Sequence, residues 1–394
     1  MANNNNKDKC NVPHLRFPEF SGEWKKCKFG DIATGFDYGM NAAAKPFDGE
    51  NKYIRITDID EASSTYNDKD IVSPDGRLTD NYVVNNRDIL LVRTGASTGK
   101  SYLYRKSDGK LYYAGFLIRA KITEHNPYFV FSQLHTHRYW RWVSIMSARS
   151  GQPGINSQEY SSFPIFTTSL HEENKISTLL SLLNERIVTQ NKIIEDLKKL
   201  KSAIIDRLYE NIDGQPCLYG DLLTVVNEKN KMMEYSNILS ASQEFGMIER
   251  NDLNIDIKYE KNAITGYKIV REGDYIVHLR SFQGGMAFSQ MVGVCSPAYI
   301  ILRPNDRLSY GYLAPYFTST SFINSLRLVT YGIRDGRSIN VDEWLNMKVC
   351  IPSLEVQRHI LSIIKSIECK LLNEIKIADN LLKQRSYLLS QMFI

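Results

Sequence analysis

The chain contains two long heptad patterns that share one register. Apolar residues recur in alternating steps of four and three, as in a helix that packs along another helix, at Ile176, Leu180, Leu183, Ile187, Ile194, Leu197, Ile204 and Leu208. Adding 184 to each number gives a second ladder, Ile360, Ile364, Ile367, Leu371, Ala378, Leu381, Leu388 and Met392. The polar interruptions also recur, since Gln190 matches Glu374 and Lys201 matches Arg385. Matching polar positions indicate a duplicated unit.

The duplication extends upstream of the two heptad segments. The same offset relates Ser169-Leu170 to Ser353-Leu354, Glu159 to Glu343 and Ile155-Asn156 to Ile339-Asn340. Further upstream the register drifts, although Gly30-Asp31 and Gly220-Asp221 begin similar segments, and Asp88 and Asp274 each precede an apolar run and a Gly-rich loop. We therefore expect two globular domains with a common framework and different loops.

These patterns predict domain boundaries and an α+β fold. We expect globular domains at 14–167 and 213–351, each followed by a long helix at 168–212 and 352–394; Gly214 and Pro216 end the first helix. The β-branched and aromatic runs predict strands at Tyr53–Ile59, Ile89–Val92, Phe116–Ile122 and Tyr299–Leu302. Shorter helices are expected at Tyr128–Ser147 and Tyr312–Val329.

The predicted helices are longer than a small domain needs, on the order of 57 Å for Leu170–Tyr209 at ~1.5 Å per residue. Two heptad patterns in one chain favour an antiparallel coiled coil between the two long helices. This coiled coil would relate the two domains by an approximate two-fold axis. Such an arrangement suits two modules that read two half-sites on one duplex. The alternatives are that each helix packs only on its own domain, or that the helices mediate homodimerisation.

Composition adds modest constraints. The net charge of +5, from 49 Lys and Arg against 44 Asp and Glu, favours a phosphate-bearing partner only weakly. The Asn-rich start lacks the apolar core of a signal peptide, and no run approaches the ~18 apolar residues of a membrane span, so we expect a cytoplasmic protein. We expect no metal site, because His135 and His137 fall on different faces of a helix and the cysteines are reduced and far apart, at Cys10, Cys27, Cys217, Cys295, Cys350 and Cys369.

The layout resembles the specificity subunit of type I restriction-modification systems over essentially the whole chain. The similar segments are Pro18-Glu19-Phe20 with Glu23-Trp24, Asp88-Ile89-Leu90, Gly151 to Asn156, and Ile351-Pro352-Ser353-Leu354-Glu355-Val356-Gln357. The first unit departs from the pattern, with Thr168 in place of Pro and Glu172-Glu173-Asn174 where the second has Val356-Gln357-Arg358.

The resemblance implies a non-catalytic DNA-recognition subunit. Each target-recognition domain would read one half of a bipartite, asymmetric site in double-stranded DNA. The helices would set the spacer and dock modification subunits, two of them, in a complex that also contains restriction subunits. The S-adenosylmethionine, ATP and Mg²⁺ chemistry would belong to those partners.

Three enzymatic alternatives fit the sequence less well. The run Gly95 to Ser101 resembles a phosphate-binding P-loop, but it has three residues rather than four between its glycines. Asn126-Pro127-Tyr128-Phe129 lacks the second proline of the adenine-methyltransferase motif. Asp58 and Asp60 would point to opposite faces of a strand, which disfavours a shared nuclease metal. A coiled-coil scaffold without DNA binding is the remaining alternative.

The candidate DNA-contacting residues lie in two loop classes of each half, where polar side chains and glycines would let the backbone approach a duplex. The loops after the apolar run contain Arg93, Thr94, Ser97, Thr98 and Lys100, and Arg280, Ser281 and Gln283. The loops around the Ile-Asn pair contain Arg149, Gln152, Asn156 and Ser157, and Arg334, Arg337, Ser338 and Asn340. We expect Asp88 and Asp274 to cap turns.

Overall fold

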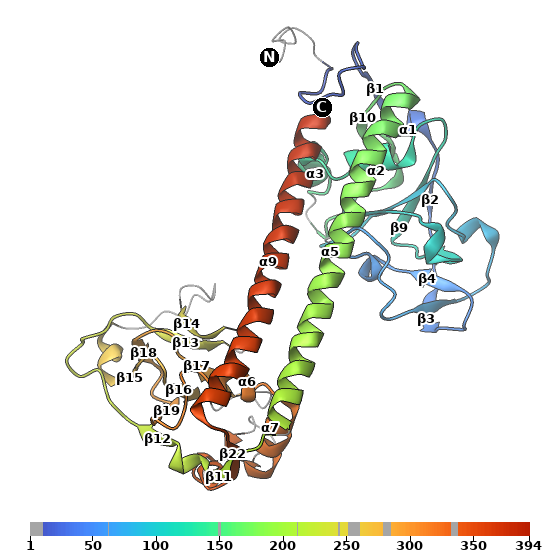
Figure 1. The fold of residues 1–394 in the computed structure, drawn as a ribbon. Helices are drawn as coiled ribbons and strands as arrows, with labels where there is room; N and C mark the ends of the chain where they lie inside the picture. The colour runs from blue at the N-terminus through green and yellow to red at the C-terminus, as the bar shows by residue number, and fades with distance from the viewer. Residues whose placement is uncertain are drawn as a thin grey trace. The chain divides into compact units, whose positions relative to one another are not determined.

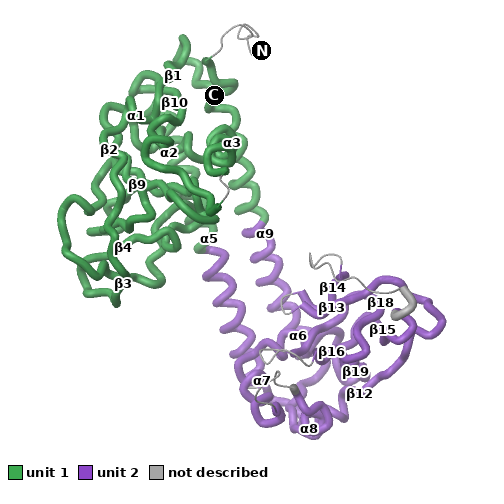
Figure 2. The backbone as a smooth tube through the Cα atoms, turned by 180° about the vertical axis from the view of Figure 1, so that it is seen from behind, with its two compact units in different colours: residues 1–192, 376–394 green, residues 193–375 purple. Residues whose placement is uncertain are grey.

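The computed structural model describes residues 11–61, 63–148, 151–210, 212–242, 245–250, 261–278, 285–331 and 338–394. The chain forms two compact units, one of residues 1–192 with 376–394 and the other of residues 193–375. The division falls within both long helices, so each unit contains one globular domain and a segment of each helix (Figure 2). Among the described residues, no helix combines the length and apolar character of a membrane span.

The first unit contains domain 1, in which short strands precede a group of short helices (Figure 1). Its strands are β1 Lys25–Lys28, β2 Ala33–Tyr38, β3 Ala43–Pro46, β4 Lys52–Ile54, β5 Val72–Asp75, β6 Asp88–Val92, β7 Ser101–Leu103, β8 Leu111–Tyr113, β9 Leu117–Ile122 and β10 Pro164–Thr167. Its helices are α1 Phe29–Ile32, α2 Pro127–Gln133, α3 His137–Met146 and α4 Ser157–Ser161, and the long helix α5 begins at Leu170 and ends at Glu210.

The second unit contains domain 2, which follows the same plan. Its strands are β11 Gln215–Leu218, β12 Leu223–Val226, β13 Leu239–Ser242, β14 Gly246–Glu249, β15 Lys268–Val270, β16 Tyr275–Val277, β17 Met286–Phe288, β18 Gly293–Cys295, β19 Ile300–Pro304, β20 Thr330–Tyr331, β21 Ser338–Ile339 and β22 Lys348–Ile351. Its helices are α6 Leu313–Tyr316, α7 Thr320–Ser325 and α8 Val341–Leu345, and the long helix α9 spans Leu354–Met392.

The central sheets of the two domains have the same antiparallel topology. The strand order is β2-β9-β6-β7 in domain 1 and β12-β19-β16-β17 in domain 2. The turns before the central strands are also equivalent, because the Asp88 carboxylate accepts from Asn85 N at 2.8 Å and the Asp274 carboxylate accepts from Arg271 N at 2.9 Å. This confirms that Asp88 and Asp274 cap turns. The duplication therefore includes the globular domains.

Strand β6 shows why the sheet forms the centre of domain 1. All five residues of the strand are buried, as expected of a strand covered on both faces. Ile89 and Leu91 pack into the cluster that includes the short helices, whereas Leu90 and Val92 pack into a second cluster on the other face. Because side chains alternate between the two faces of a strand, the position of a residue in β6 decides which of the two clusters it joins.

Three sequence predictions for the domains were wrong in detail. The strand predicted at Tyr53–Ile59 ends at Ile54, because the Asp58 carboxylate accepts from Arg55 N at 2.8 Å and closes a 3-10 turn over Ile56–Asp58. The predicted helix at Tyr128–Ser147 is two helices, since Thr136 begins α3 by accepting from Tyr139 N. Similarly, Ser319 begins α7 inside the predicted helix at Tyr312–Val329.

The long helices pair antiparallel within each unit. In the first unit, Ile176 and Leu180 of α5 pack with Met392 of α9, and one to two turns further along Leu183 and Ile187 pack with Leu381. In the second unit, Ile205 and Tyr209 share a core with Ile360 and Ile364, and Lys201 Nζ lies 2.7 Å from Glu368 Oε1. Ile360 and Ile364 are the 184-residue equivalents of Ile176 and Leu180, so the repeated residues make repeated contacts.

Candidate nucleic-acid interface

The two predicted loop classes of domain 1 lie against each other. Ile155 N donates to Arg93 O at 2.8 Å, Gly95 N donates to Pro153 O at 3.0 Å, and Thr94 forms a β-bridge with Gly154. Residues 93–100, which follow β6, and residues 152–157, which lead into α4, therefore form a single surface, which we call the paired loops.

Buried tyrosines hold the first of the paired loops. Tyr160 OH donates to Val92 O at 2.6 Å, and Tyr139 OH donates to Gly99 O at 2.7 Å. Gly99 has a φ of 95°, and a Cβ there would lie 2.7 Å from Val143 Cγ1, so this position requires glycine. Both ends of the loop are thus fixed by the domain core, and rigid support of this kind suits a recognition site.

Arg93 is the predicted residue with the clearest recognition geometry. Its guanidinium carbon lies 4.7 Å from the centroid of the Tyr38 ring. The Tyr38 hydroxyl in turn accepts from Ser157 N at 3.3 Å. Phe116 O accepts from Arg93 N at 3.1 Å. Neither Tyr38 nor Phe116 was among the sequence candidates. Both rings are exposed, at 41% for Tyr38 and 59% for Phe116.

Several other predicted site residues have structural partners. Thr98 is buried and its hydroxyl donates to Gly95 O at 2.7 Å. Lys100 Nζ lies 3.0 Å from the Glu61 carboxylate. Asn156 accepts from Glu159 N at 2.9 Å as the N-cap of α4, and Asn340 accepts from Glu343 N at 3.3 Å as the N-cap of α8. The two asparagines therefore recur because the framework needs them, whereas Ser97, Gln152 and Ser157 lie half-buried or exposed in the paired loops.

Most of the domain 2 candidates lie outside the described residues. These are Arg280, Ser281, Gln283, Arg334 and Arg337, and Arg149 of domain 1 also falls outside them. The segments that flank the domain 2 loops are described. His278 N donates to Gly285 O at 2.8 Å, and Tyr331 pairs with Ser338 across β20 and β21. Each loop of domain 2 therefore begins and ends on paired backbone.

The P-loop alternative fails on topology as well as on spacing. Ser101 begins strand β7 rather than a helix, so the loop does not lead into a helix N-terminus as a P-loop does. The loop amides also bond within the loop and its strand, with Gly99 N donating to Val92 O and Lys100 N donating to Ser97 O. These amides are not available to wrap a phosphate.

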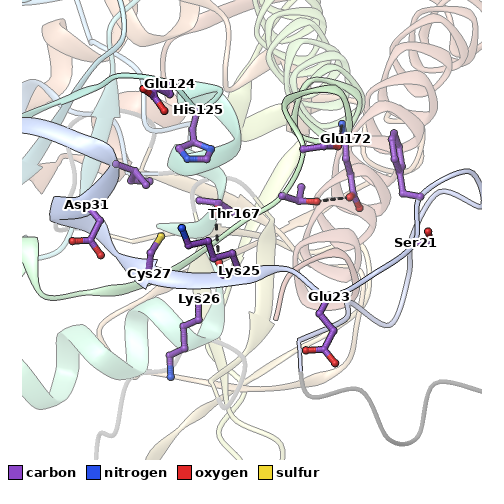
Figure 3. A pocket seen from close by; sticks show the side chains of 14 residues that line it. Ser21, Glu23, Lys25, Lys26, Cys27, Asp31, Glu124, His125, Thr167 and Glu172 are labelled. Atoms are coloured by element: carbon purple, nitrogen blue, oxygen red, sulfur yellow. Dashed lines mark hydrogen bonds between the residues drawn. The ribbon is translucent and has the colours of Figure 1, made fainter.

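An open pocket at the start of α5 brings together a thiol, a histidine and carboxylates (Figure 3). Burial raises the pKa of the Cys27 thiol, and its sulfur lies 3.7 Å from Ile165 O. The equivalent Cys217 makes the same contact with Val349 O. Since a reactive cysteine needs a lowered pKa, this pattern indicates a structural thiol.

The pocket carboxylates belong to the framework. Buried Glu172 accepts two bonds of 2.7 Å from the Arg16 guanidinium and one of 2.6 Å from Thr168 Oγ1. Buried Glu173 lies 2.8 Å from both His125 Nδ1 and Asn126 N. These contacts fasten the N-terminal segment and the start of α2 to the start of α5.

The architecture defines a class of proteins built from two α+β domains, each followed by a long helix, with antiparallel helix segments in each unit. This is the fold of type I restriction-modification S subunits. A chain from a structure concerning complex assembly and conformational transition of a type I system matches with a TM-score of 0.59 and 14% identity, over 97% of this chain and 99% of that one. The type I S subunit from M. genitalium matches with a TM-score of 0.56 and 14% identity, over 97% of this chain and 99% of that one. No protein-family profile and no curated protein sequence matches the chain.

Proposed function

We propose that this chain is the DNA sequence-specificity subunit of a type I restriction-modification complex. The observation that carries the proposal is the duplicated domain, in which equivalent sheets and turns support unlike loops. Two domains of one fold with different recognition surfaces suit a bipartite, asymmetric site in double-stranded DNA. The likeness in fold to S subunits over nearly the whole chain supports the same function.

The proposal includes partners that carry the chemistry. Modification subunits, two per chain, would bind S-adenosylmethionine and dock on the long helices, and restriction subunits would supply the ATP- and Mg²⁺-dependent steps in the cytoplasm. The solved type I system whose structure concerns complex assembly supports an assembly with other subunits. This chain itself would bind and position DNA without catalysing a reaction.

The test is to co-express the chain with the modification subunits of its own system and to map methylated adenines across a genome. A split motif with a constant gap is the expected result, because two domains on fixed helices would read two separated half-sites. A continuous motif would contradict the two-domain assignment. Methylation without any sequence preference would favour a scaffold and would overturn the proposal. The absence of methylation when the partner subunits are active would do the same.

The same measurement checks the part played by the paired loops. Arg93→Ala should weaken or relax recognition in one half of the motif and leave the other half unchanged, because Arg93 lies in domain 1 only. A bidentate Arg contact with a base contributes about 1–3 kcal/mol to discrimination. Arg77→Ala, at an exposed position of domain 1 outside the paired loops, is the matched control. Equal relaxation of both halves would contradict the assignment of Arg93 to one half-site.

A further inference from the structure

Tyr38, Arg93 and Phe116 lie on one face of the central sheet of domain 1. Leu91 pairs with Ile118 across β6 and β9, and Tyr38 pairs with Ile118 across β2 and β9. Side chains on one face recur every second residue, and directly paired residues share a face. Arg93 follows Leu91 by two positions and Phe116 precedes Ile118 by two, so both continue the face on which Tyr38 lies.

The Arg93 guanidinium is held in place without losing its donors to a carboxylate. The guanidinium lies over the Tyr38 ring, 4.7 Å from its centroid, and this cation–π contact restrains its position. Among the described residues, Arg93 forms no ion pair. A stacked guanidinium with unused N–H groups matches the two acceptors that guanine presents in the major groove, and this is the commonest specific contact of arginine with a base pair.

Phe116 adds an exposed apolar ring on the same face of the sheet. It lies in the turn closed by Leu117 N, which donates to Ala114 O at 2.8 Å, and 59% of its surface is exposed. Single exposed apolar residues are common on proteins, but this one lies directly across from Arg93. Phenylalanine contacts the 5-methyl group of thymine in the major groove.

We propose that Tyr38, Arg93 and Phe116 form a base-contacting patch, in which Arg93 reads a guanine and Phe116 packs on the methyl group of a neighbouring thymine. The patch deepens the proposed function and rests on it, since it names what domain 1 contacts in its half-site. Tyr38 is a positioning residue, because it acts through the Arg93 guanidinium.

Among the described residues of domain 2, a small side chain stands at the position equivalent to Phe116. Val277 pairs with Ile300 as Leu91 pairs with Ile118, so the register makes Ala298 the equivalent of Phe116. A methyl side chain extends much less far from the backbone than a phenyl ring. A phenyl ring at this position of the sheet is therefore specific to domain 1.

The test measures how tightly the assembled methyltransferase complex binds its mapped site when single functional groups of the bases are removed. Each thymine in the domain 1 half is replaced in turn by deoxyuridine, which lacks the methyl group, and each guanine by 7-deazaguanine, which lacks N7. One deoxyuridine should weaken binding roughly four-fold, as expected for one buried methyl group. Phe116→Ala should weaken binding of the unmodified site at least as much and abolish the effect of that deoxyuridine.

The arginine is tested in the same way. Arg93→Ala should weaken binding about ten-fold and remove the effect of one 7-deazaguanine. Tyr38→Leu should reduce the loss of binding caused by that 7-deazaguanine. Tyr38→Phe should retain this loss, because the aromatic ring under Arg93 remains. Phe47→Ala is the matched control, since Phe47 is an exposed phenylalanine after β3 and is 38% exposed; it should bind as the unmodified chain does.

The outcomes separate the patch from the proposed function. If the complex methylates a split motif but Phe116→Ala binds normally, or keeps its full sensitivity to every deoxyuridine, the patch assignment is overturned and the specificity function stands. If the complex shows no sequence-specific methylation, both fall. Thermal unfolding of each variant distinguishes lost contacts from lost folding.

Discussion

Glu173 and Gln357 occupy equivalent positions near the start of the two long helices. Both form hydrogen bonds to equivalent regions of their domains, Glu173 through a carboxylate and Gln357 through an amide. Glu173 accepts from Asn126 N and contacts His125, whereas Gln357 accepts from Ser309 N at 2.7 Å and donates to Arg307 O at 2.9 Å. Ser309 is the 184-residue equivalent of His125. Both side chains are fully buried, so each domain fixes the start of its long helix with polar bonds inside the protein.

Loss of the Glu173 carboxylate should destabilise the first unit. Glu173→Ala removes a buried carboxylate and leaves the half-buried Asn126 N–H without its acceptor, so the free energy of unfolding should fall by about 3 kcal/mol. Glu173→Gln should cost about 1 kcal/mol, because one acceptor oxygen remains. Urea unfolding measures both. Glu185→Ala, an exposed change on the same helix, is the control, and an equal effect of Glu185→Ala and Glu173→Ala would contradict the structural role.

His135 should make stability depend on pH. Burial, with the positive charge of Arg385, lowers the pKa of His135 to about 4. As the pH falls below about 6.5, the unfolded chain binds a proton that the folded chain does not bind until the pH nears 4. Stability attributable to this residue is therefore present above pH 6.5 and is lost between pH 6.5 and 4, by about 3 kcal/mol.

This prediction is checked by urea unfolding at pH 7 and pH 4.5. The loss of stability on acidification should be smaller in His135→Gln than in the unmodified chain, and His359→Gln, at an exposed position, should behave as the unmodified chain does. An identical pH dependence in all three proteins would refute the shifted pKa of His135.

Residue-level prediction from the sequence was most successful where a local rule applied. The turn caps Asp88 and Asp274 followed from position alone. Tyr38 was missed because the register of β2 shifts between Thr34 and Asp37, and a bulge of this kind changes the face on which later side chains lie. Its distance of 55 residues from Arg93 in the chain also leaves no local signal.

Among the elements, the long helices were predicted most accurately. The first long helix, predicted at 168–212, spans Leu170–Glu210, so each predicted bound lies two residues beyond the observed one. Heptad periodicity over many turns gives a strong signal, because each turn repeats it. The shorter helices were predicted as continuous because the capping residues Thr136 and Ser319 are ordinary polar residues within apolar runs.

The seam between the helices should carry much of the stability of the first unit. Ile187 is 5% exposed and packs with Leu183 and Leu381, whereas its neighbour Val188 is 43% exposed. Ile187→Ala should lower the free energy of unfolding by about 2–3 kcal/mol, through lost burial and a residual cavity. Val188→Ala should change it by less than about 0.5 kcal/mol. Equal effects of the two substitutions in chemical unfolding would rule out the seam.

At the scale of the whole molecule, the first compact unit is assembled from distant parts of the chain. In the first unit, Met392 and Phe393 pack on Trp24 and Phe129 of domain 1, and Leu15 N donates to Gln391 O at 2.8 Å. The contacts of the second unit, by contrast, come from one continuous segment, residues 193–375.

Removal of residues 388–394 should therefore affect the two units unequally. The deletion exposes Trp24 and Ile176, so amides of α5 at 176–187 should exchange with solvent much faster. Amides at 360–364, in the core of the second unit, should retain their protection. Hydrogen exchange with mass spectrometry measures both segments, and equal loss of protection would show that the units do not fold independently.

The discontinuous first unit has a consequence for biosynthesis. Domains commonly fold in the order in which the ribosome makes them, but residues 376–394 are translated after the whole of the second unit. Until then the apolar surface around Trp24, Phe129 and Ile176 has no covering from Met392 and Phe393. Synthesis of the first unit therefore begins before that of the second unit and ends after it. During that interval the nascent chain exposes an apolar surface, to which we expect a chaperone to bind.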